Sequence, residues 1–383
     1  MLRELKREHH ITYLALVDGS AGQSERTLAN QYCHELICVP HTTRPKFSAG
    51  FYIELAGNLL SDLPYFMKKY QSSKMTETIE SLLKRDEFDV LVCDFLQPSV
   101  NIPDRITTPT VLFQHNVEAM IWKRHYEVQS NPFKKKYLYN QWMKSRRYEQ
   151  AACRRFDMVV TVSDSDEKQL RDEYGVRNVA AIPTGVDIDY FSPQDEISRE
   201  PNNIVFTGSM DWLPNEDAMQ YFIREVLPAI RQKLPATTLT VVGRDPYPSL
   251  IELSKSLEGI EVTGRVDDVR PYIARASVFI VPIRIGGGTR LKIYEAMAMG
   301  TPVVSTTVGA EGLPLENGKD LLIADTPADL AGAVTGLLTN PQTAREMGLR
   351  SAKLMQEHYG WKNVARVFAN VCDSAVASGN GLR

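Results

Sequence analysis

The sequence lacks any long apolar run, and no stretch approaches the roughly 18 apolar residues of a transmembrane helix. It also lacks paired cysteines, because its five cysteines are scattered and none forms a Cys-x-x-Cys motif. Such a set in a large chain is typical of reduced thiols in the cytosol. Neither sign of charge dominates, since 44 basic residues oppose 47 acidic ones and leave a formal charge of −3. We therefore expect a cytoplasmic protein that does not bind nucleic acid in general.

What is present predicts a two-domain α/β protein. A chain of 383 residues exceeds what one hydrophobic core usually serves, and 43% hydrophobic residues can fill two cores. Short, unbroken apolar runs alternate with helical patterns, which indicates parallel strands covered by helices on both faces. The predicted strands are 11–17, 36–39, 90–93, 110–113, 158–162, 179–182, 204–207, 239–242, 260–262, 278–281, 303–305 and 321–323.

Composition also predicts where the domains divide. A polar, proline-bearing segment separates the halves, and a helical pattern with an apolar stripe closes the chain. The predicted divisions are a first domain 1–190, a linker 191–202, a second domain 203–358, a final helix 359–376 and a disordered tail 377–383. The chain begins in a charged helical run, whereas a doubly wound domain opens with a strand. We expect the first strand and its glycine-rich loop to be missing.

The glycine-rich run from Gly286 to Gly300 is the most informative stretch. It follows the apolar segment Val278–Pro282 and opens an amphipathic helix. Glycines allow close backbone approach to a ligand, and a helix N-terminus attracts phosphate. Arg290 and Lys292 add formal charge there, and Glu295 could accept hydrogen bonds from two ribose hydroxyls. The pattern predicts a phosphate or diphosphate site, although a glycine loop that merely caps a helix is the alternative.

The segment Gly286–Val304 resembles the donor-site motif of GT-B glycosyltransferases of family 4. Other segments that resemble this family are His115-Asn116-Val117-Glu118, Val162-Ser163, Pro183-Thr184-Gly185-Val186-Asp187, Phe206-Thr207-Gly208-Ser209, Val241-Val242-Gly243 and Gly264-Arg265-Val266-Asp267-Asp268. The resemblance implies two facing, Rossmann-like, doubly wound domains with a cleft between them. It also implies a C-terminal helix that crosses back to the first domain.

The resemblance places the nucleotide in the second domain. The residues that it assigns to donor binding are Gly208, Ser209, Arg265, Val266, Gly287, Gly288, Thr289, Arg290, Lys292 and Glu295. Relatives often carry Arg directly after the first of these glycines and Lys about five residues later, where this chain has Ser209 and Pro214-Asn215. Arg290 and Lys292 could supply the missing charge. The first glutamate of the family's Glu-x₇-Glu pair falls on Gly287, so the donor sugar is open. An exposed structural role for Arg265 also stays open.

His115 follows a predicted strand at the sheet edge where open α/β sheets bind ligands. By resemblance, His115 and Glu118 are the catalytic candidates, with His115 holding a sugar hydroxyl or the acceptor. The alternative is a structural histidine.

No Asp-x-Asp motif is placed to hold a metal on a diphosphate, because Asp164-Ser165-Asp166 lies at a helix start, where Asp is a favoured cap. We expect no metal and no cofactor, with the helix dipole, amides and cations stabilising the leaving diphosphate.

The segment Trp122–Arg155 departs from the acidic average. It holds ten Lys and Arg against two Glu, with seven interleaved aromatic residues. This composition suits an anionic membrane surface or a phosphate-bearing acceptor, and a solvated basic helix with a buried aromatic stripe is the alternative.

The resemblance thus implies transfer of a sugar, with retention, from a nucleoside diphosphate sugar to an acceptor hydroxyl of a glycan or lipid. Cell-surface polysaccharide or glycolipid synthesis is the expected setting, at the inner face of the membrane if the protein is peripheral. Two other hypotheses stay open, namely an inactive GT-B binding protein and a GT-B enzyme of another kind, such as a sugar-nucleotide epimerase or a phosphorylase.

Overall fold

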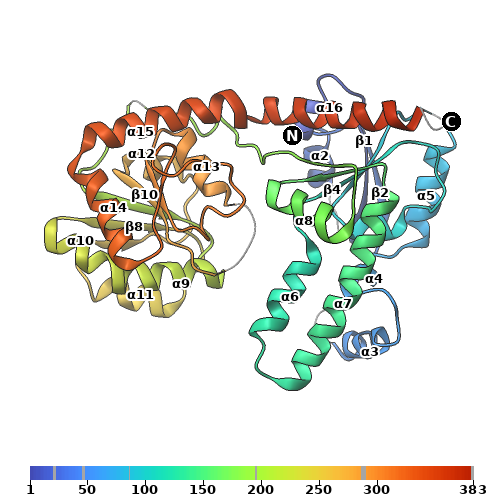
Figure 1. The fold of residues 1–383 in the computed structure, drawn as a ribbon, viewed down its shortest axis with the longest axis horizontal. Coiled ribbons are helices and arrows are strands. Elements are labelled where there is room, and N and C mark those ends of the chain that lie inside the picture. Colours follow the sequence, from blue (N-terminus) through green and yellow to red (C-terminus); the bar gives the residue numbers. More distant parts are fainter. Residues whose placement is uncertain (20–22, 45–47, 86, 195, 286–289, 381–383) are drawn as a thin grey trace. The chain divides into compact units, whose positions relative to one another are not determined.

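Runs of Val, Ile and Leu form parallel strands in both halves of the chain, because strands buried on both faces need apolar side chains throughout. The computed structural model describes residues 1–19, 23–44, 48–85, 87–194, 196–285 and 290–380. The chain divides into two compact units, Met1–Ile182 with Ala365–Arg383, and Pro183–Val364. The elements of both are labelled in Figure 1.

The first unit holds two parallel sheets. β1 (Thr12–Val17) pairs with β2 (Glu35–Pro40). The second sheet has the order β3 (Leu91–Asp94), β4 (Thr110–Gln114), β5 (Met158–Thr161) and β6 (Val179–Ala181). Among the described residues no ladder joins β1 to β3, and both strands line a groove of about 420 Å³.

Helices cover these sheets, and several begin at side-chain caps. Ser72, Asn131 and Ser163 each accept hydrogen bonds from backbone amides in the first turn. The helices are α1 (Leu2–Leu5), α2 (Gln23–Ala29), α3 (Ala49–Asn58), α4 (Tyr65–Lys68), α5 (Ser73–Leu83), α6 (Glu118–Val128), α7 (Pro132–Arg155) and α8 (Asp164–Tyr174), with a 3₁₀ turn η1 at Gln97–Asn101.

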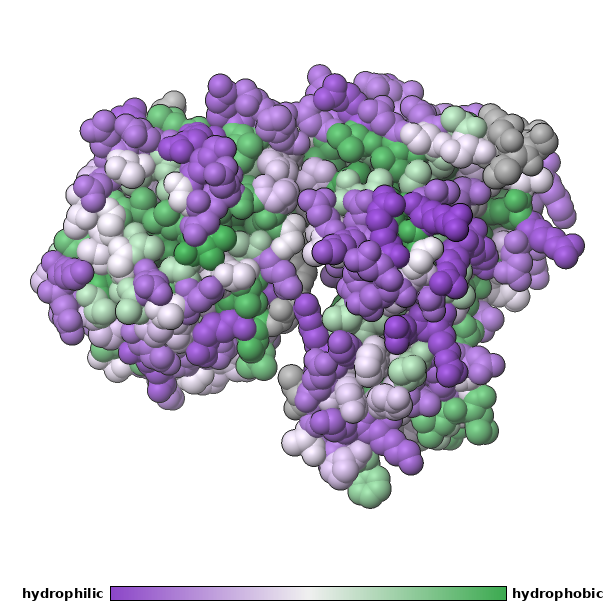
Figure 2. Space-filling view, in the orientation of Figure 1, coloured by the Kyte–Doolittle hydropathy of each residue, from purple (hydrophilic) through white to green (hydrophobic). Residues whose placement is uncertain are grey.

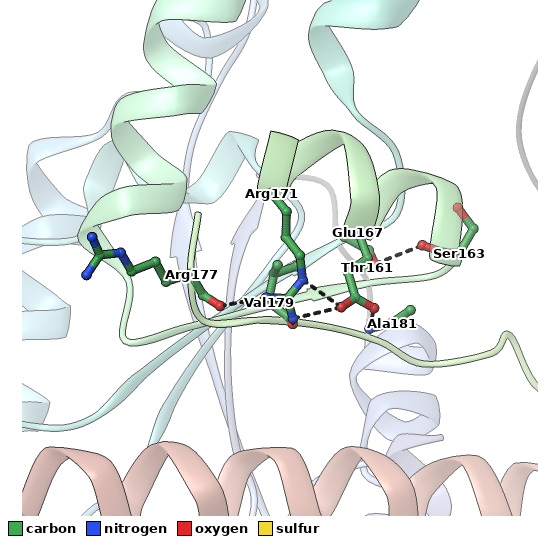
Figure 3. Close-up of polar contacts among 7 residues, drawn as sticks. All are labelled: Thr161, Ser163, Glu167, Arg171, Arg177, Val179 and Ala181. Atoms are coloured by element: carbon green, nitrogen blue, oxygen red, sulfur yellow. Dashed lines mark hydrogen bonds and ion pairs between the residues drawn. The ribbon is translucent and has the colours of Figure 1, made fainter. Parts of the chain in front are cut away.

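A polar network fixes the short strand β6 against α8 (Figure 3). Glu167 accepts from Arg171 and from the Ala181 amide, at 2.8 and 2.9 Å. Arg171 also donates to the carbonyls of Arg177 and Val179. The cap of α8 is Ser163, whose Oγ accepts from the Asp166 amide at 3.2 Å. Asp164 and Asp166 therefore lie in the first turn, where carboxylates favour the helix dipole.

The second unit has one six-stranded parallel sheet in the order β12-β11-β10-β7-β8-β9. Its strands are β7 (Asn203–Thr207), β8 (Thr238–Val242), β9 (Ile260–Val262), β10 (Val278–Val281), β11 (Val303–Ser305) and β12 (Leu322–Ile323). Counted within the unit, this is the doubly wound order 3-2-1-4-5-6. The chain reverses direction across the sheet between β7 and β10, and ligands bind such sheets at the carboxyl ends of these two strands.

The helices of the second unit lie on both sides of this sheet (Figure 1). They are α9 (Leu213–Tyr221), α10 (Leu227–Lys233), α11 (Pro248–Lys255), α12 (Arg270–Arg275), α13 (Leu291–Ala298), α14 (Pro327–Thr339) and α15 (Pro341–Leu354), with π-helical turns η2 (Phe222–Val226) and η3 (Met355–Tyr359). Their apolar faces and the strands form one continuous buried core, so this unit is a rigid platform for the loops at its edge.

The last helix, α16 (Trp361–Asn380), belongs to both units. From Ala365 onward it belongs to the first unit, where Phe368, Cys372 and Ala375 pack in a core with Phe113. The predicted helix that crosses back to the first domain is therefore confirmed.

Three expectations about boundaries differ from the structure. The N-terminal part of the first unit ends at Ile182 rather than at residue 190, because residues 183–190 belong to the second unit. The predicted linker 191–202 is part of the second unit, because Phe191 and Ile197 pack on its core and Arg199 donates to the Gly300 carbonyl. The tail predicted to be disordered from residue 377 is helical as far as Asn380, because α16 continues that far. Residues 381–383 lie outside the described residues.

Candidate functional site

The best-defined polar cluster lies at the reversal point of the six-stranded sheet. Gly208 and Ser209 directly follow β7, and Arg290 and Lys292 begin α13 after β10. These four residues were predicted from sequence to share a site, and the topology brings them together. Gly287, Gly288 and Thr289 lie outside the described residues.

Lys292 is the centre of this cluster. Its Nζ donates to Asn215 Oδ1 at 3.0 Å and lies 4.1 Å from the centre of the Phe206 ring. A Cβ placed on Gly208 would lie 2.6 Å from this Nζ and 2.7 Å from Asn215 Nδ2. The absence of a side chain at Gly208 is therefore what lets the lysine reach the end of β7.

Two residues without a predicted role complete the cluster. Asn215 is buried and donates through Nδ2 to the Ser209 carbonyl at 2.8 Å. Arg244, after β8, donates through Nε to Ser209 Oγ at 2.8 Å. Asn215 could have been suspected from its place in the family pattern, whereas Arg244 directly follows Gly243 and no pattern singles it out.

The cluster is electrostatically positive. Burial, and then the neighbouring charge of Arg290, lower the pKa of Lys292 to about 7. Arg290 is itself buried, with its guanidinium carbon 4.9 Å from the centre of the Trp212 ring. Burial raises the pKa of Glu295, while Lys292 opposes that rise. The site should therefore attract an anion, because a negative charge beside Lys292 stabilises the protonated form of the lysine that burial and Arg290 disfavour.

Arg265 and Val266 are not part of this cluster. They follow β9, the outermost strand, which is two strand spacings or roughly 10 Å from β7. Arg265 is exposed, and no hydrogen bond or ion pair joins it to the described residues of the cluster. Gly264 before it has φ of +70°, a conformation that favours glycine. Their assignment to donor binding stays a prediction.

A second polar site lies in the first unit at the carboxyl ends of β3 and β4. His115 Nε2 lies 2.7 Å from Asp94 Oδ1, so the carboxylate orients the imidazole. The His115 ring stacks on Phe95 with centroids 4.0 Å apart. Phe95 has φ of +69°, a strained conformation for a bulky residue. Asp94 was not predicted, because the sequence pattern ended the strand at Cys93.

Glu118 begins α6 and is held by a buried carboxylate. Glu149 of α7 accepts from the Glu118 amide at 2.7 Å, from the Ala119 amide at 3.1 Å and from Tyr174 Oη at 2.8 Å. It thereby caps α6, whose own N-cap residue Val117 offers no side-chain bond. Burial raises the pKa of Glu149 to about 7, although these donors oppose the shift. Glu118 itself accepts from Gln97 at 3.1 Å, and burial raises its pKa.

The basic segment Trp122–Arg155 forms parts of α6 and α7. Several of its aromatic side chains join these two helices, since Tyr126 stacks on Trp142 with centroids 5.7 Å apart. Lys123 and Lys135 lie over these same two rings.

Within the described ranges, no group of three or more His, Cys, Asp or Glu is arranged to hold a metal ion. Nor is any helix in those ranges long and apolar enough to cross a membrane.

Two features, a doubly wound nucleotide-type sheet and a second α/β unit that shares the last helix, define the class of GT-B proteins. Family profiles agree, because "Glycosyltransferase Family 4" matches residues 1–190 and "Glycosyl transferases group 1" matches residues 201–340. The chain belongs to this family of glycosyltransferases.

Individual relatives are distant. The chain is 28% identical over 232 residues to a phosphatidyl-myo-inositol mannosyltransferase of Mycobacterium leprae, which covers 58% of this chain and 61% of that relative. It thus spans less than two thirds of that relative's length. The fold is similar to that of sucrose-phosphate synthase from Thermosynechococcus elongatus, with a TM-score of 0.66, 16% identity and coverage of 97% and 100% of the two chains. Anabaena HepE in complex with UDP and glucose gives a TM-score of 0.63, 14% identity and coverage of 97% and 94%.

Proposed function

We propose that this protein transfers a hexose from a nucleoside diphosphate sugar to an acceptor hydroxyl, with retention at the anomeric carbon. The observation that carries the proposal is the cluster of Lys292, Arg290 and Gly208 at the reversal point of the sheet. The family membership supports it, as do the name of the mycobacterial relative, a mannosyltransferase, and the UDP bound to HepE.

In this proposal the cations of the cluster stabilise the leaving group. The bond between the anomeric carbon and the diphosphate oxygen breaks, and its electron pair stays on the diphosphate. The acceptor oxygen bonds to the same face of the anomeric carbon and gives up its proton to the leaving diphosphate oxygen. Arg290 and Lys292 bind the negative charge that develops on the diphosphate, so that no divalent ion is required. His115, oriented by Asp94, holds a hydroxyl of the sugar or the acceptor.

The nucleotide test is a thermal-shift screen with UDP, GDP and their sugars. A nucleoside diphosphate at 100 times its Kd should stabilise the protein by about 2.7 kcal/mol. Gly332→Ala, in α14 and with nothing near its Cβ position, should keep the shift, whereas Lys292→Met should lose it. If none of the nucleotides raises the melting temperature, the proposed donor class is wrong.

The requirement for an acceptor and the independence from divalent metal need a separate experiment. With a responding nucleotide sugar, free nucleotide should form only when an acceptor is supplied, and EDTA should leave that rate unchanged. Restoration of an EDTA-abolished rate by Mg²⁺ or Mn²⁺ would contradict metal-independent leaving-group stabilisation. Conversion of the sugar without an acceptor would instead favour the epimerase hypothesis. We propose a glycan or a lipid-linked glycan as acceptor, in cell-surface polysaccharide or glycolipid synthesis.

A further inference from the structure

A second pocket lies at the opposite edge of the six-stranded sheet from the cluster around Lys292. It has a volume of about 530 Å³, and its lining includes Asn202, directly before β7, and Ser277, directly before β10. Because the strands are parallel, these residues mark the amino ends of the strands, whereas the Lys292 cluster lies at the carboxyl ends. Pockets of this size commonly bind small molecules. This one, named here the amino-edge pocket, is therefore separate from the proposed donor site.

Most of the residues that line the amino-edge pocket are apolar. They come from the segment before β7, from the end of α14 and from α15, and they include Ile197, Leu337, Leu338 and Leu349. Leu349 is 58% exposed, so part of this lining is open to solvent. Figure 2 shows apolar surface between hydrophilic side chains in the part of the second unit where Figure 1 draws α14. The pocket can therefore take up an apolar group.

Two arginines stand in this apolar lining. Arg199 donates to the Gly300 carbonyl, and Arg345 of α15 has no hydrogen-bond or ion-pair partner among the described residues. Burial lowers the pKa of Arg199, and the charge of Arg345 lowers it further, so the two guanidinium groups are close enough to repel each other. None of the described residues that line the pocket is an Asp or a Glu. The pair thus carries two positive charges that the described lining does not neutralise.

The acids close in sequence to these arginines do not remove this charge. Glu200 lies 4.0 Å from Arg275, with which it forms an ion pair. Glu346 accepts a hydrogen bond from Gln342 on its own helix, and Glu196 is exposed outside the lining. An anion that enters the pocket would therefore meet the two arginines first.

We propose that the amino-edge pocket binds a small phosphomonoester with an apolar body, such as an aryl phosphate. A phosphomonoester carries about two negative charges at pH 7, which matches the two arginines, whereas a carboxylate carries one. Each guanidinium presents a planar fork of N–H donors that fits phosphate oxygens. The apolar body lies against the leucines of the pocket. The inference goes beyond the proposed function, because this pocket and the donor site lie at opposite edges of the sheet.

The test is isothermal titration calorimetry with phenyl phosphate on the full chain carrying Lys292→Met, because the proposed donor site could otherwise bind the same phosphate. Phenyl phosphate should bind at a single site. Adding Arg345→Gln should weaken this binding by about tenfold or more, since it removes charge-assisted hydrogen bonds. The matched control is Arg350→Gln, which changes an exposed arginine of the same helix outside the described lining. Arg345 is the better target than Arg199, because it has no partner among the described residues to lose.

Two further probes separate the charge from the apolar contact. Benzoate has the same ring with one negative charge, and inorganic phosphate has the charge without the ring. Each should bind about tenfold or more weakly than phenyl phosphate, because each lacks one of the two interactions. Benzoate that binds as tightly would contradict the match of two charges, and inorganic phosphate that binds as tightly would contradict the apolar contact.

Absence of saturable binding by phenyl phosphate would overturn the proposal, as would equal affinity in the Arg345→Gln and Arg350→Gln variants. Equal melting temperatures of these two variants would show that any difference in affinity is not a loss of folding. With the native Lys292 in place, Arg345→Gln should keep the nucleotide-induced thermal shift of the wild type. That measurement separates failure of this inference from failure of the proposed function.

Discussion

Lys292 should make nucleotide binding depend on pH. Its pKa of about 7 means that the lysine is largely neutral in the free protein at pH 8. A bound diphosphate favours the charged form and raises that pKa, so binding at pH 8 should take up close to one proton. The sign follows directly: raising the pH removes the proton that binding needs, and affinity must fall.

The size of this effect follows from the fraction of protonated lysine. That fraction falls from about one half at pH 7 to about one hundredth at pH 9, when the free pKa is about 7. If only the protonated form binds, Kd should rise by about fiftyfold over this range, or ~2.3 kcal/mol. The second phosphate ionisation of the ligand, with a pKa of about 6, is about nine-tenths complete at pH 7 and adds little.

The assay is isothermal titration calorimetry with UDP or GDP, whichever binds, in two buffers of different ionisation enthalpy. The difference in measured heat gives the protons taken up. Lys292→Arg keeps its charge at every pH used, so its affinity should be flat between pH 7.5 and 9. Lys292→Met should bind weakly with no proton uptake. Proton uptake that persists in Lys292→Met would refute the reasoning, as would a wild-type Kd that does not change with pH.

Three further predictions concern neighbouring features. Gly208→Ala should weaken nucleotide binding roughly tenfold, because its Cβ would lie only 2.6 Å from Lys292 Nζ. The control Gly332→Ala should raise the unfolding free energy by about 0.5–1 kcal/mol. Unchanged calorimetric affinity in Gly208→Ala would contradict the geometry. His115→Ala should lower the rate of transfer by about 100-fold while leaving nucleotide affinity intact, because the hydroxyl that His115 holds would be misplaced. A rate equal to wild type would make the histidine structural. Between pH 4.5 and 7 the native state should hold a proton on Glu149 that the unfolded chain releases, so the free energy of unfolding should fall as pH rises, by a few kcal/mol at most. In Glu149→Gln the free energy of unfolding, measured with denaturant, should depend less on pH. An identical pH dependence in the variant and the wild type would be evidence against the raised pKa.

The strands could be predicted from sequence because their signal is local. Each of the twelve predicted apolar runs is a strand in the structure, with ends that differ by about one residue. One such shift mattered, since β3 ends at Asp94 rather than Cys93, and Asp94 is the partner of His115. The family resemblance, rather than any local pattern, assigned Gly208 and Lys292 to one donor site, and in the structure the carboxyl ends of β7 and β10 lie side by side.

Other features needed tertiary packing that no local pattern records. Glu149 looked like one of two acids in a basic helix, yet it is buried and caps α6 across a separation of 31 residues. The segment 191–202 looked like a linker because it is polar and contains prolines, whereas its few apolar residues pack on the second core. The aromatic residues of α6 and α7 similarly suggested a binding surface, although Tyr126 and Trp142 are used in packing and Phe133 is the one most exposed.

The departure of this chain from the family pattern at Ser209 and Asn215 now has a physical account. Proteins with the family pattern often carry Arg directly after the glycine that corresponds to Gly208, and Lys about five residues later. Here Asn215 is neutral, but its Oδ1 accepts from Lys292, which comes from α13, 77 residues further along the chain. The lysine reaches this place because Gly208 has no side chain, and Arg244 occupies the other side by donating to Ser209. Cationic groups thus stand beside the end of β7 although the local sequence there has none. Burial, and then the charge of Arg290, lower the pKa of Lys292 in the free protein, so an arriving diphosphate would both bind the charge and restore it.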